Sequence, residues 1–287
     1  MCANENTWRP NLFSRALIRL FENDKPEGVT IFVFDTETTG LEEKADRIIQ
    51  FSALKLNIKG ENVTVVEKYN QYFDPGFPLP EKITELTGIT PEMLEGKPND
   101  DEAYKIISEI FGKDPIVCAH NLPFDEKFVN ELYVRHGDKF EPLFRFDTLA
   151  IARSLYAKEE VGNHKLGTLA SFFHIDEGIS FHSANDDTTV CGRLLIKFYR
   201  IFKKKLEKDS EKSLPEKISF NYWWGYGHST TPGRVYANTD LGTLYFDEKT
   251  GAWIGVNVDL SSLNMNAIHE EALKRSTVVK GYFRNKL

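Results

Sequence analysis

Ile31-Phe-Val-Phe-Asp35-Thr-Glu37-Thr-Thr-Gly40 is the stretch around which we expect the fold to be built, because four large apolar residues lead directly into two carboxylates. Successive side chains of an extended chain point to opposite faces, so Asp35 and Glu37 would share one face. The apolar residues on both faces predict a central strand that is covered on both sides. Neighbouring carboxylates repel each other, and a bound cation is the usual compensation. For this pair taken alone, however, a solvated loop after a core strand is the favoured interpretation, and the other motifs must decide.

The composition is that of an ordinary globular protein, at a length that exceeds one compact domain. Of its 287 residues, 41% are hydrophobic and 28% are charged, and the net charge is −7. The negative charge argues against nucleic-acid binding through general positive charge. Carboxylates that hold divalent cations nevertheless count as negative in that sum. We expect one main domain with a smaller appendage.

The cysteines and the apolar runs bear on the compartment. Cys2, Cys118 and Cys191 lie far apart in the sequence, so it predicts neither a zinc site nor a disulfide framework. A reducing compartment is expected. No apolar run approaches the roughly 20 residues that a membrane-spanning helix needs, and the amino terminus does not resemble a signal peptide. We therefore predict a cytoplasmic protein with no membrane partner.

The order of the predicted elements indicates an α/β fold. After the opening strand, residues 46–57 and 63–73 read as two strands that a short turn makes antiparallel. Residues 115–119 and 144–147 read as further strands, each followed by a helix. The sequence thus predicts a mixed five-stranded sheet with helices on both faces. Asp147 has two interpretations, and we favour a helix cap over a chemical role.

The chain divides into three predicted parts. We expect a helical extension over residues 1–27, the main domain over 28–207 and a small α+β region over 208–287. The last part contains three alternating segments that predict an antiparallel meander, with a helix over 261–276. Aromatic residues are dense over 220–226. We interpret them as a small core, with a surface for single-stranded nucleic acid as the alternative.

Three short stretches place acidic residues at predicted strand ends or helix starts. They are Asp35-Thr-Glu37, Asn121-Leu-Pro-Phe-Asp125 and His182-Ser-Ala-Asn-Asp-Asp187. An open α/β sheet gathers its functional groups at one edge in this way. Four carboxylates on one rim would form an oxygen-only site that suits Mg²⁺ or Mn²⁺.

These stretches resemble the three motifs of the DEDDh exonuclease family, which includes the proofreading epsilon subunit of bacterial DNA polymerase III, RNase T and oligoribonuclease. Asp46-Arg-Ile-Ile49, Glu85-Leu-Thr-Gly-Ile-Thr90 and His164-Lys-Leu-Gly-Thr-Leu-Ala170 resemble the epsilon type in particular. The resemblance covers about residues 28–205. Thr87 is a departure, because the epsilon-type pattern often has histidine there. The resemblance implies an RNase H-like fold and metal-dependent 3′→5′ hydrolysis of nucleic acid to nucleoside 5′-monophosphates.

The resemblance also implies a role for each motif residue. Asp35, Glu37 and Asp187 would bind the first of two divalent cations, Mg²⁺ or Mn²⁺. Asp35 would bridge to the second cation, which Asp125 would hold largely through water. Two cations about 3.5–4 Å apart shield the charge that develops during phosphodiester hydrolysis. His182 would be the general base, since an imidazole with a pKa of about 6.5 accepts a proton near neutral pH.

Substrate contacts are implied by the resemblance as well. Thr36, Thr38 and Leu41 would lie against the terminal nucleotide, Leu86 and Phe124 would shape the base pocket, and Asn121 would lie nearby. Stacking on apolar or aromatic side chains tolerates any base. For the leucines and the phenylalanine, packing in the core is an equally weighted alternative.

The sequence as a whole predicts a 3′→5′ exonuclease that acts on the 3′ end of nucleic acid. Single-stranded or frayed DNA is the favoured substrate, and a replicative polymerase is a candidate partner. An RNA-trimming exoribonuclease is the first alternative. A non-catalytic module that binds nucleic acid or a replication partner is the second, but such a module has no need for carboxylates that repel one another.

Overall fold

The computed structural model describes residues 6–178, 184–223 and 234–284. The chain forms two compact units, a larger unit of residues 19–199 and a smaller unit of residues 1–18 with 200–287. The division falls within the helices α1 (Leu12–Phe21) and α9 (Ala184–Ser210). Both ends of the chain therefore contribute to the smaller unit. The domain limits that we predicted at residues 27 and 207 stay a proposal.

The larger unit is built on the predicted five-stranded mixed sheet, which is confirmed. The strand order is β4-β3-β2-β5-β6, with β2 in the centre. The strands are β2 (Val29–Thr38), β3 (Ile48–Lys59), β4 (Asn62–Tyr72), β5 (Ile116–Ala119) and β6 (Phe144–Asp147). The hairpin strands β2, β3 and β4 pair antiparallel, whereas β5 and β6 join in parallel after helical connections.

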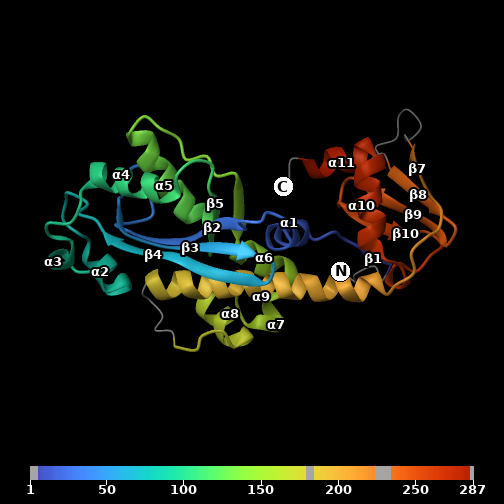
Figure 1. The fold of residues 1–287 in the computed structure, drawn as a ribbon, viewed down its shortest axis with the longest axis horizontal. Coiled ribbons are helices and arrows are strands. Elements are labelled where there is room, and N and C mark those ends of the chain that lie inside the picture. Colours follow the sequence, from blue (N-terminus) through green and yellow to red (C-terminus); the bar gives the residue numbers. More distant parts are fainter. Residues whose placement is uncertain (1–5, 179–183, 224–233, 285–287) are drawn as a thin grey trace. The chain divides into compact units, whose positions relative to one another are not determined.

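Helices cover both faces of this sheet, as Figure 1 shows. On one face, Phe32 and Phe34 pack against Phe111 of α4 (Asp100–Phe111), with ring centroids 5.5 and 5.3 Å apart. The helix α5 (Leu122–Arg135) contributes to the same core. The helix α9 packs on the opposite face. It approaches β2 closely at Gly192, where an added Cβ would lie in van der Waals contact with Val33, 3.8 Å from its Cγ2 atom. Successive side chains of β2 thus pack alternately into the two layers of helices.

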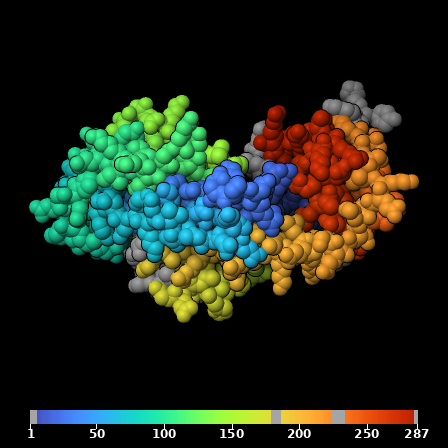
Figure 2. Space-filling model, viewed as in Figure 1, coloured from blue at the N-terminus to red at the C-terminus, as the bar shows by residue number. Residues whose placement is uncertain are grey.

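Short helices complete the larger unit. They are α2 (Glu81–Thr87), α3 (Pro91–Leu94), α6 (Thr148–Leu155), α7 (Lys158–Val161) and α8 (Leu166–Phe173). Asp147 accepts a hydrogen bond from the backbone of Leu149 at 2.9 Å, so the predicted helix cap is confirmed. The outer strand β4 is mostly exposed, and its light-blue side chains form part of the front surface in Figure 2.

The smaller unit contains a second, antiparallel sheet in the order β1-β10-β9-β8-β7. Its strands are β1 (Thr7–Trp8), β7 (Ile218–Trp223), β8 (Arg234–Thr239), β9 (Gly242–Asp247) and β10 (Ala252–Gly255). The predicted meander is β8 to β10. The structure extends it with β7 on one side and with β1, from the opposite end of the chain, on the other. A strand of two residues is too short to leave a periodic signal.

Helices pack on this second sheet. A 3₁₀ helix (Leu260–Ser262) precedes α10 (Met265–Arg275) and α11 (Thr277–Arg284). The core contains the fully buried Trp253 and Phe246, and Phe220 of the aromatic stretch packs against it. Part of that stretch therefore serves the core, as we expected. No helix among the described residues is long and apolar enough to cross a membrane.

Candidate active site

The end of β2 carries two acids opposite two buried polar residues. In the antiparallel register, Ser52 of β3 lies opposite Asp35, and Gln50 lies opposite Glu37, so each pair shares a face. Gln50 and Ser52 are buried, and both donate to Oδ1 of Asn70, over 2.8 and 3.1 Å. We did not predict this polar support from the sequence. Its signal there is the pair of polar residues within the otherwise apolar segment Ile48 to Leu54.

Asp125 in the first turn of α5 is tied directly to β2. Its Oδ1 accepts hydrogen bonds from the backbone N–H and the hydroxyl of Thr36, at 2.9 and 2.8 Å. Only 3% of Asp125 is exposed. Burial raises the pKa of this carboxyl to about 7, although the hydrogen bonds from Thr36 act to lower it. The acid of the second motif is thereby held beside the acids of the first.

The acids of all three motifs form one cluster, which we call the acidic cluster: Asp35, Glu37, Asp125 and Asp187. Burial and then the charges of Asp125, Glu37 and Asp187 raise the pKa of Asp35 well above its ordinary value. Burial, followed by the charge of Asp187, raises the pKa of Glu37 to about 7. Asp187 lies in the first turn of α9, which packs on the face of β2 that carries Asp35. Residues 150 positions apart are thus brought into electrostatic contact.

The chemistry of the cluster fits divalent cations. Carboxylate oxygens are the ligands that Mg²⁺ and Mn²⁺ prefer. Because each ionised member raises the pKa of its neighbours, a bound cation would remove a free-energy cost that the protein otherwise carries. Within the described part of the chain, no three His, Cys, Asp or Glu side chains are grouped as a formed metal site. The fit therefore rests on the donor atoms and their electrostatics, not on a preformed cage.

His182 and His120 are the histidines of the predicted motifs that bear on proton transfer. The predicted base, His182, lies outside the described residues. His120 places Nε2 2.9 Å from the carbonyl oxygen of His164 and Nδ1 2.9 Å from the hydroxyl of Thr148. Burial lowers its pKa. Both ring nitrogens of His120 have protein partners, so this histidine orders the turn after β5 and is a poor candidate for proton transfer.

Asn121 occupies a strained turn between β5 and α5. Its φ is +73°, a left-handed conformation that asparagine tolerates better than most residues. The backbone N–H of Asn121 donates to Oδ1 of Asp147 at 3.0 Å, and the same oxygen caps α6. Asp147 therefore fixes the turn that precedes Asp125, a positioning role that we did not predict.

The threonines that we predicted as substrate contacts have internal partners. Thr36 is 5% exposed, and its hydroxyl donates to Asp125. Thr38 is 6% exposed, and its hydroxyl donates to the carbonyl oxygen of Gly40 at 2.6 Å. These hydroxyls hold the end of β2 together, so a contact with substrate would have to use their other surfaces.

The apolar residues that we predicted as substrate contacts lie in different environments. Leu41 is 71% exposed and Leu86 is 62% exposed, which argues against core packing for both. Phe124 is half-buried, and its ring centroid lies 5.2 Å from that of Phe128 in the core. The leucines offer bare apolar surface next to the first motif or on α2, whereas Phe124 is part of the core boundary.

Hydrogen bonds from two directions hold the loop that carries Leu41. A Cβ on Gly40 would lie 2.3 Å from Oδ2 of Asp46, so a larger residue here would have to displace this carboxylate. Asp46 accepts from the backbone N–H of Glu42 at 2.9 Å. On α5, Nζ of Lys127 donates to the carbonyl oxygen of Leu41 at 2.5 Å. The exposed leucine is consequently held in place by its backbone.

A basic cavity of about 600 Å³ borders the turn at Asn121. His120 and three cationic residues, Arg153, Lys158 and Lys165, line it. Among the described residues these three cations have no ion-pair partner. Uncompensated positive charge next to the turn is notable in a chain whose net charge is −7.

The fold and the acidic cluster define an α/β protein of the nuclease type. The model of the exonuclease family RNase_T matches residues 32–195, which is more than half of the chain. The chain belongs to this exonuclease family, and the resemblance stated above is confirmed.

Relatives of known name support the same assignment. The PolC-type DNA polymerase III of Pediococcus pentosaceus is 36% identical over 177 residues, which cover 61% of this chain and 12% of that protein. The PolC-type DNA polymerase III of Streptococcus pyogenes serotype M18 is 40% identical over 176 residues, again 61% and 12%. The chain thus matches about an eighth of the length of these relatives.

Solved structures show the same fold. Escherichia coli exonuclease I in complex with a dA16 oligonucleotide has a TM-score of 0.51 and 19% identity, over 76% of this chain and 55% of that chain. A product-bound exonuclease I has a TM-score of 0.51 and 17% identity, over 89% and 70%. The predicted RNase H-like fold is confirmed.

Proposed function

We propose that this chain is a 3′→5′ exonuclease of the DEDDh type, which removes nucleotides from the 3′ end of DNA and releases nucleoside 5′-monophosphates. The observation that carries the proposal is the acidic cluster, because it joins the acids of three separate motifs within a domain of the exonuclease family. An arrangement in which each carboxylate raises the pKa of another is costly unless a cation is to be bound.

Each motif residue has a proposed task. Asp35, Glu37 and Asp187 would hold the first divalent cation, Mg²⁺ or Mn²⁺. Asp35 would also reach the second cation, on the side of Asp125. When bound, the cations would supply charge neutralisation to the attacking and leaving oxygens. His182 would take the proton from the attacking water. The hydrogen bonds from Thr36 keep Asp125 in a fixed orientation for this purpose.

The surroundings of the acidic cluster suit a single strand of nucleic acid. Leu41 and Leu86 would contact the terminal base, since both are exposed and apolar. Arg153, Lys158 and Lys165 in the basic cavity would contact backbone phosphates. The positive charge of this cavity would attract phosphates even though the chain as a whole has a negative net charge.

DNA is the proposed substrate because of the names of the relatives. Two are called DNA polymerase III, and the exonuclease I structure contains a DNA oligonucleotide. Association with a replicative polymerase is a further proposal, since the chain matches only 12% of those polymerases. The cytoplasmic location stays a prediction.

The experiment that tests this function uses the full chain with oligonucleotides labelled at the 5′ or the 3′ end. Single-stranded and duplex DNA and RNA are incubated with Mg²⁺, with Mn²⁺ or with EDTA. We expect a ladder of 5′-labelled DNA products that shortens from the 3′ end and needs a divalent cation. Internal cuts, or cleavage that continues in EDTA, would overturn the proposal. Faster degradation of RNA than of DNA would assign the enzyme to RNA trimming instead.

A further inference from the structure

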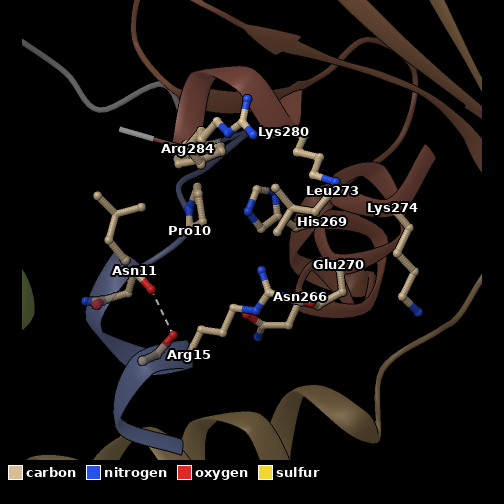
Figure 3. A pocket seen from close by; sticks show the side chains of 13 residues that line it. Pro10, Asn11, Arg15, Asn266, His269, Glu270, Leu273, Lys274, Lys280 and Arg284 are labelled. Atoms are coloured by element: carbon tan, nitrogen blue, oxygen red, sulfur yellow. Dashed lines mark hydrogen bonds and ion pairs between the residues drawn. The ribbon is translucent and has the colours of Figure 1, made fainter. Parts of the chain in front are cut away.

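The smaller unit has a cavity of its own, which we call the α11 cavity. It has a volume of about 360 Å³ and is lined by residues of the segments 10–15 and 266–284, all of which belong to the smaller unit. Figure 3 shows α1 on one side of it and α10 and α11 on the other. Leu12, Leu273 and Phe283 give it an apolar floor. Small-molecule sites of proteins commonly combine such a floor with a few polar groups, within about 300–1,000 Å³.

His269 supplies a fixed hydrogen-bond donor at the bottom of this cavity. The indole N–H of Trp253 donates to Nδ1 of His269 at 3.2 Å, so the proton of the neutral ring sits on Nε2. Only 7% of His269 is exposed, and burial together with the charge of Arg15 lowers its pKa to about 4. In Figure 3 the ring projects from α10 toward Pro10. No described residue accepts a hydrogen bond from Nε2.

The rim of the cavity is positively charged. Four cationic residues line it, Arg15, Lys274, Lys280 and Arg284, and Glu270 is the one carboxylate among the described residues that do so. Glu270 pairs with Arg15 at 3.0 Å. Lys280 and Arg284 lie one turn apart on α11 and form no ion pair with any described residue. Two cations are thus left to bind an anion.

We propose that the α11 cavity binds one nucleotide, with its phosphate at Lys280 and Arg284 and its base on the apolar floor. Hydrogen bonds between a guanidinium or ammonium group and a phosphate are charge-assisted and hence strong. Leu12 and Leu273 are half-buried and provide apolar surface for a flat ring, and Nε2–H of His269 provides a donor for a base carbonyl. The site goes beyond the proposed nuclease function, because it shares no residue with the acidic cluster. The nucleotide is either a free nucleoside 5′-monophosphate or one unit of a single strand.

Binding is measured by isothermal titration with the full chain carrying Asp35→Ala, so that hydrolysis does not consume the ligand. The ligands are dTMP, thymidine, inorganic phosphate and the oligonucleotide (dT)₁₂, all in EDTA. The test variant adds Lys280→Gln and Arg284→Gln. The matched control adds Lys249→Gln and Lys217→Gln, which are exposed lysines of the same unit outside the cavity. Thermal unfolding by circular dichroism verifies that each variant is folded.

We expect the test variant to bind dTMP or (dT)₁₂ at least 10-fold more weakly than the control, which should bind like the parent. Thymidine and phosphate should each bind more weakly than dTMP. Tighter binding of dTMP than of (dT)₁₂, per site, would identify a site for the free nucleotide, and the reverse would identify a strand site. Equal binding by test and control variants, or no saturable binding of any ligand, would overturn the inference. Failure here leaves the nuclease assay unaffected, since that assay depends on the acidic cluster.

Discussion

The acidic cluster and the α11 cavity differ in the sign and in the burial of their charged groups. In the acidic cluster, carboxylates are buried beside one another, and burial raises the pKa of both Glu37 and Asp125 to about 7. In the α11 cavity the buried titratable group, His269, is neutral, and the cations stand at the rim. The cluster therefore carries a free-energy cost when its carboxyls ionise, which a bound cation would remove, whereas the cations of the cavity are already placed to bind an anion. Burial of the titratable groups, more than the net charge of the chain, thus decides which ligand each site is suited to bind.

The largest expected effect is the loss of hydrolysis when the acidic cluster is altered. Asp35→Ala removes the carboxylate that the other three surround, and we expect hydrolysis to fall by about 10³-fold or more, since cation binding is lost. Initial rates on 5′-labelled (dT)₁₂ with Mg²⁺ measure the effect. The exposed Asp24→Ala is the matched control and should retain full activity. Unchanged activity of Asp35→Ala would remove the cation assignment.

The second prediction concerns the proposed general base, which takes a proton from the attacking water. His182→Ala should reduce the maximal rate by about 10²–10⁴-fold, which is the usual contribution of a general base. For the unsubstituted chain, the rate should decline below about pH 6.5 as the imidazole becomes protonated. Single-turnover rates between pH 5.5 and 8.5 measure both. A profile that stays flat into acid would assign the proton transfer to another group.

A third prediction uses stability to distinguish the buried acids from the exposed cations. With cations removed, Asp125 and Glu37 keep their protons up to about pH 7 in the folded chain, but lose them near pH 4 when unfolded. The folded state thus binds more protons across this window, so its stability should fall as pH rises from 4 to 7. A loss of about 2 kcal/mol or more is expected, because one pKa unit corresponds to about 1.4 kcal/mol.

Urea unfolding in EDTA at pH 5 and pH 7.5 measures this loss. Glu37→Gln should reduce the difference between the two pH values, and Glu67→Gln on the exposed strand β4 should leave it unchanged. Added Mg²⁺ should restore stability at pH 7.5. Equal stability of the cation-free chain at both pH values would contradict the raised pKa values.

The smallest expected effect tests the exposed apolar surface. Leu41→Ser should raise KM about 5- to 10-fold with little change in kcat, which corresponds to about 1 kcal/mol and to the lower end of what contact with one base contributes. Val134→Ser, on α5 and 50% exposed, is the control. Steady-state kinetics on (dT)₁₂ provide the measurement. A fall in kcat with no change in KM would mean that Leu41 positions the loop and does not contact the substrate.

Local patterns were sufficient for the part of the site that lies along one stretch of chain. The alternation of Ile31 to Glu37 predicted both the central strand and the shared face of Asp35 and Glu37, and the structure has β2 in the middle of the sheet. Asp147 before a helical segment predicted the cap. Motif spacing predicted that Asp125 and Asp187 would join the acids of β2, because parallel elements of an α/β sheet end at one edge.

Tertiary structure alone decided the partners of these residues. Gln50 and Ser52 face the acids only through the register of β2 and β3. Cys118 and Cys191 are 73 residues apart, yet their sulfur atoms lie 3.9 Å from each other. β1 pairs with β10 although some 240 residues separate them, and Trp253 fixes the tautomer of His269 across the core of the smaller unit.

The physical reason is the range of the interactions. Periodicity, capping and turn formation depend on residues a few positions apart, so local patterns predicted the five strands of the larger unit and the strands β8 to β10, but neither β1 nor β7. Strand register, buried hydrogen-bond partners and cavities arise when distant segments pack, and no local pattern records which segments will meet. The α11 cavity is the clearest case, since its walls come from both ends of the chain.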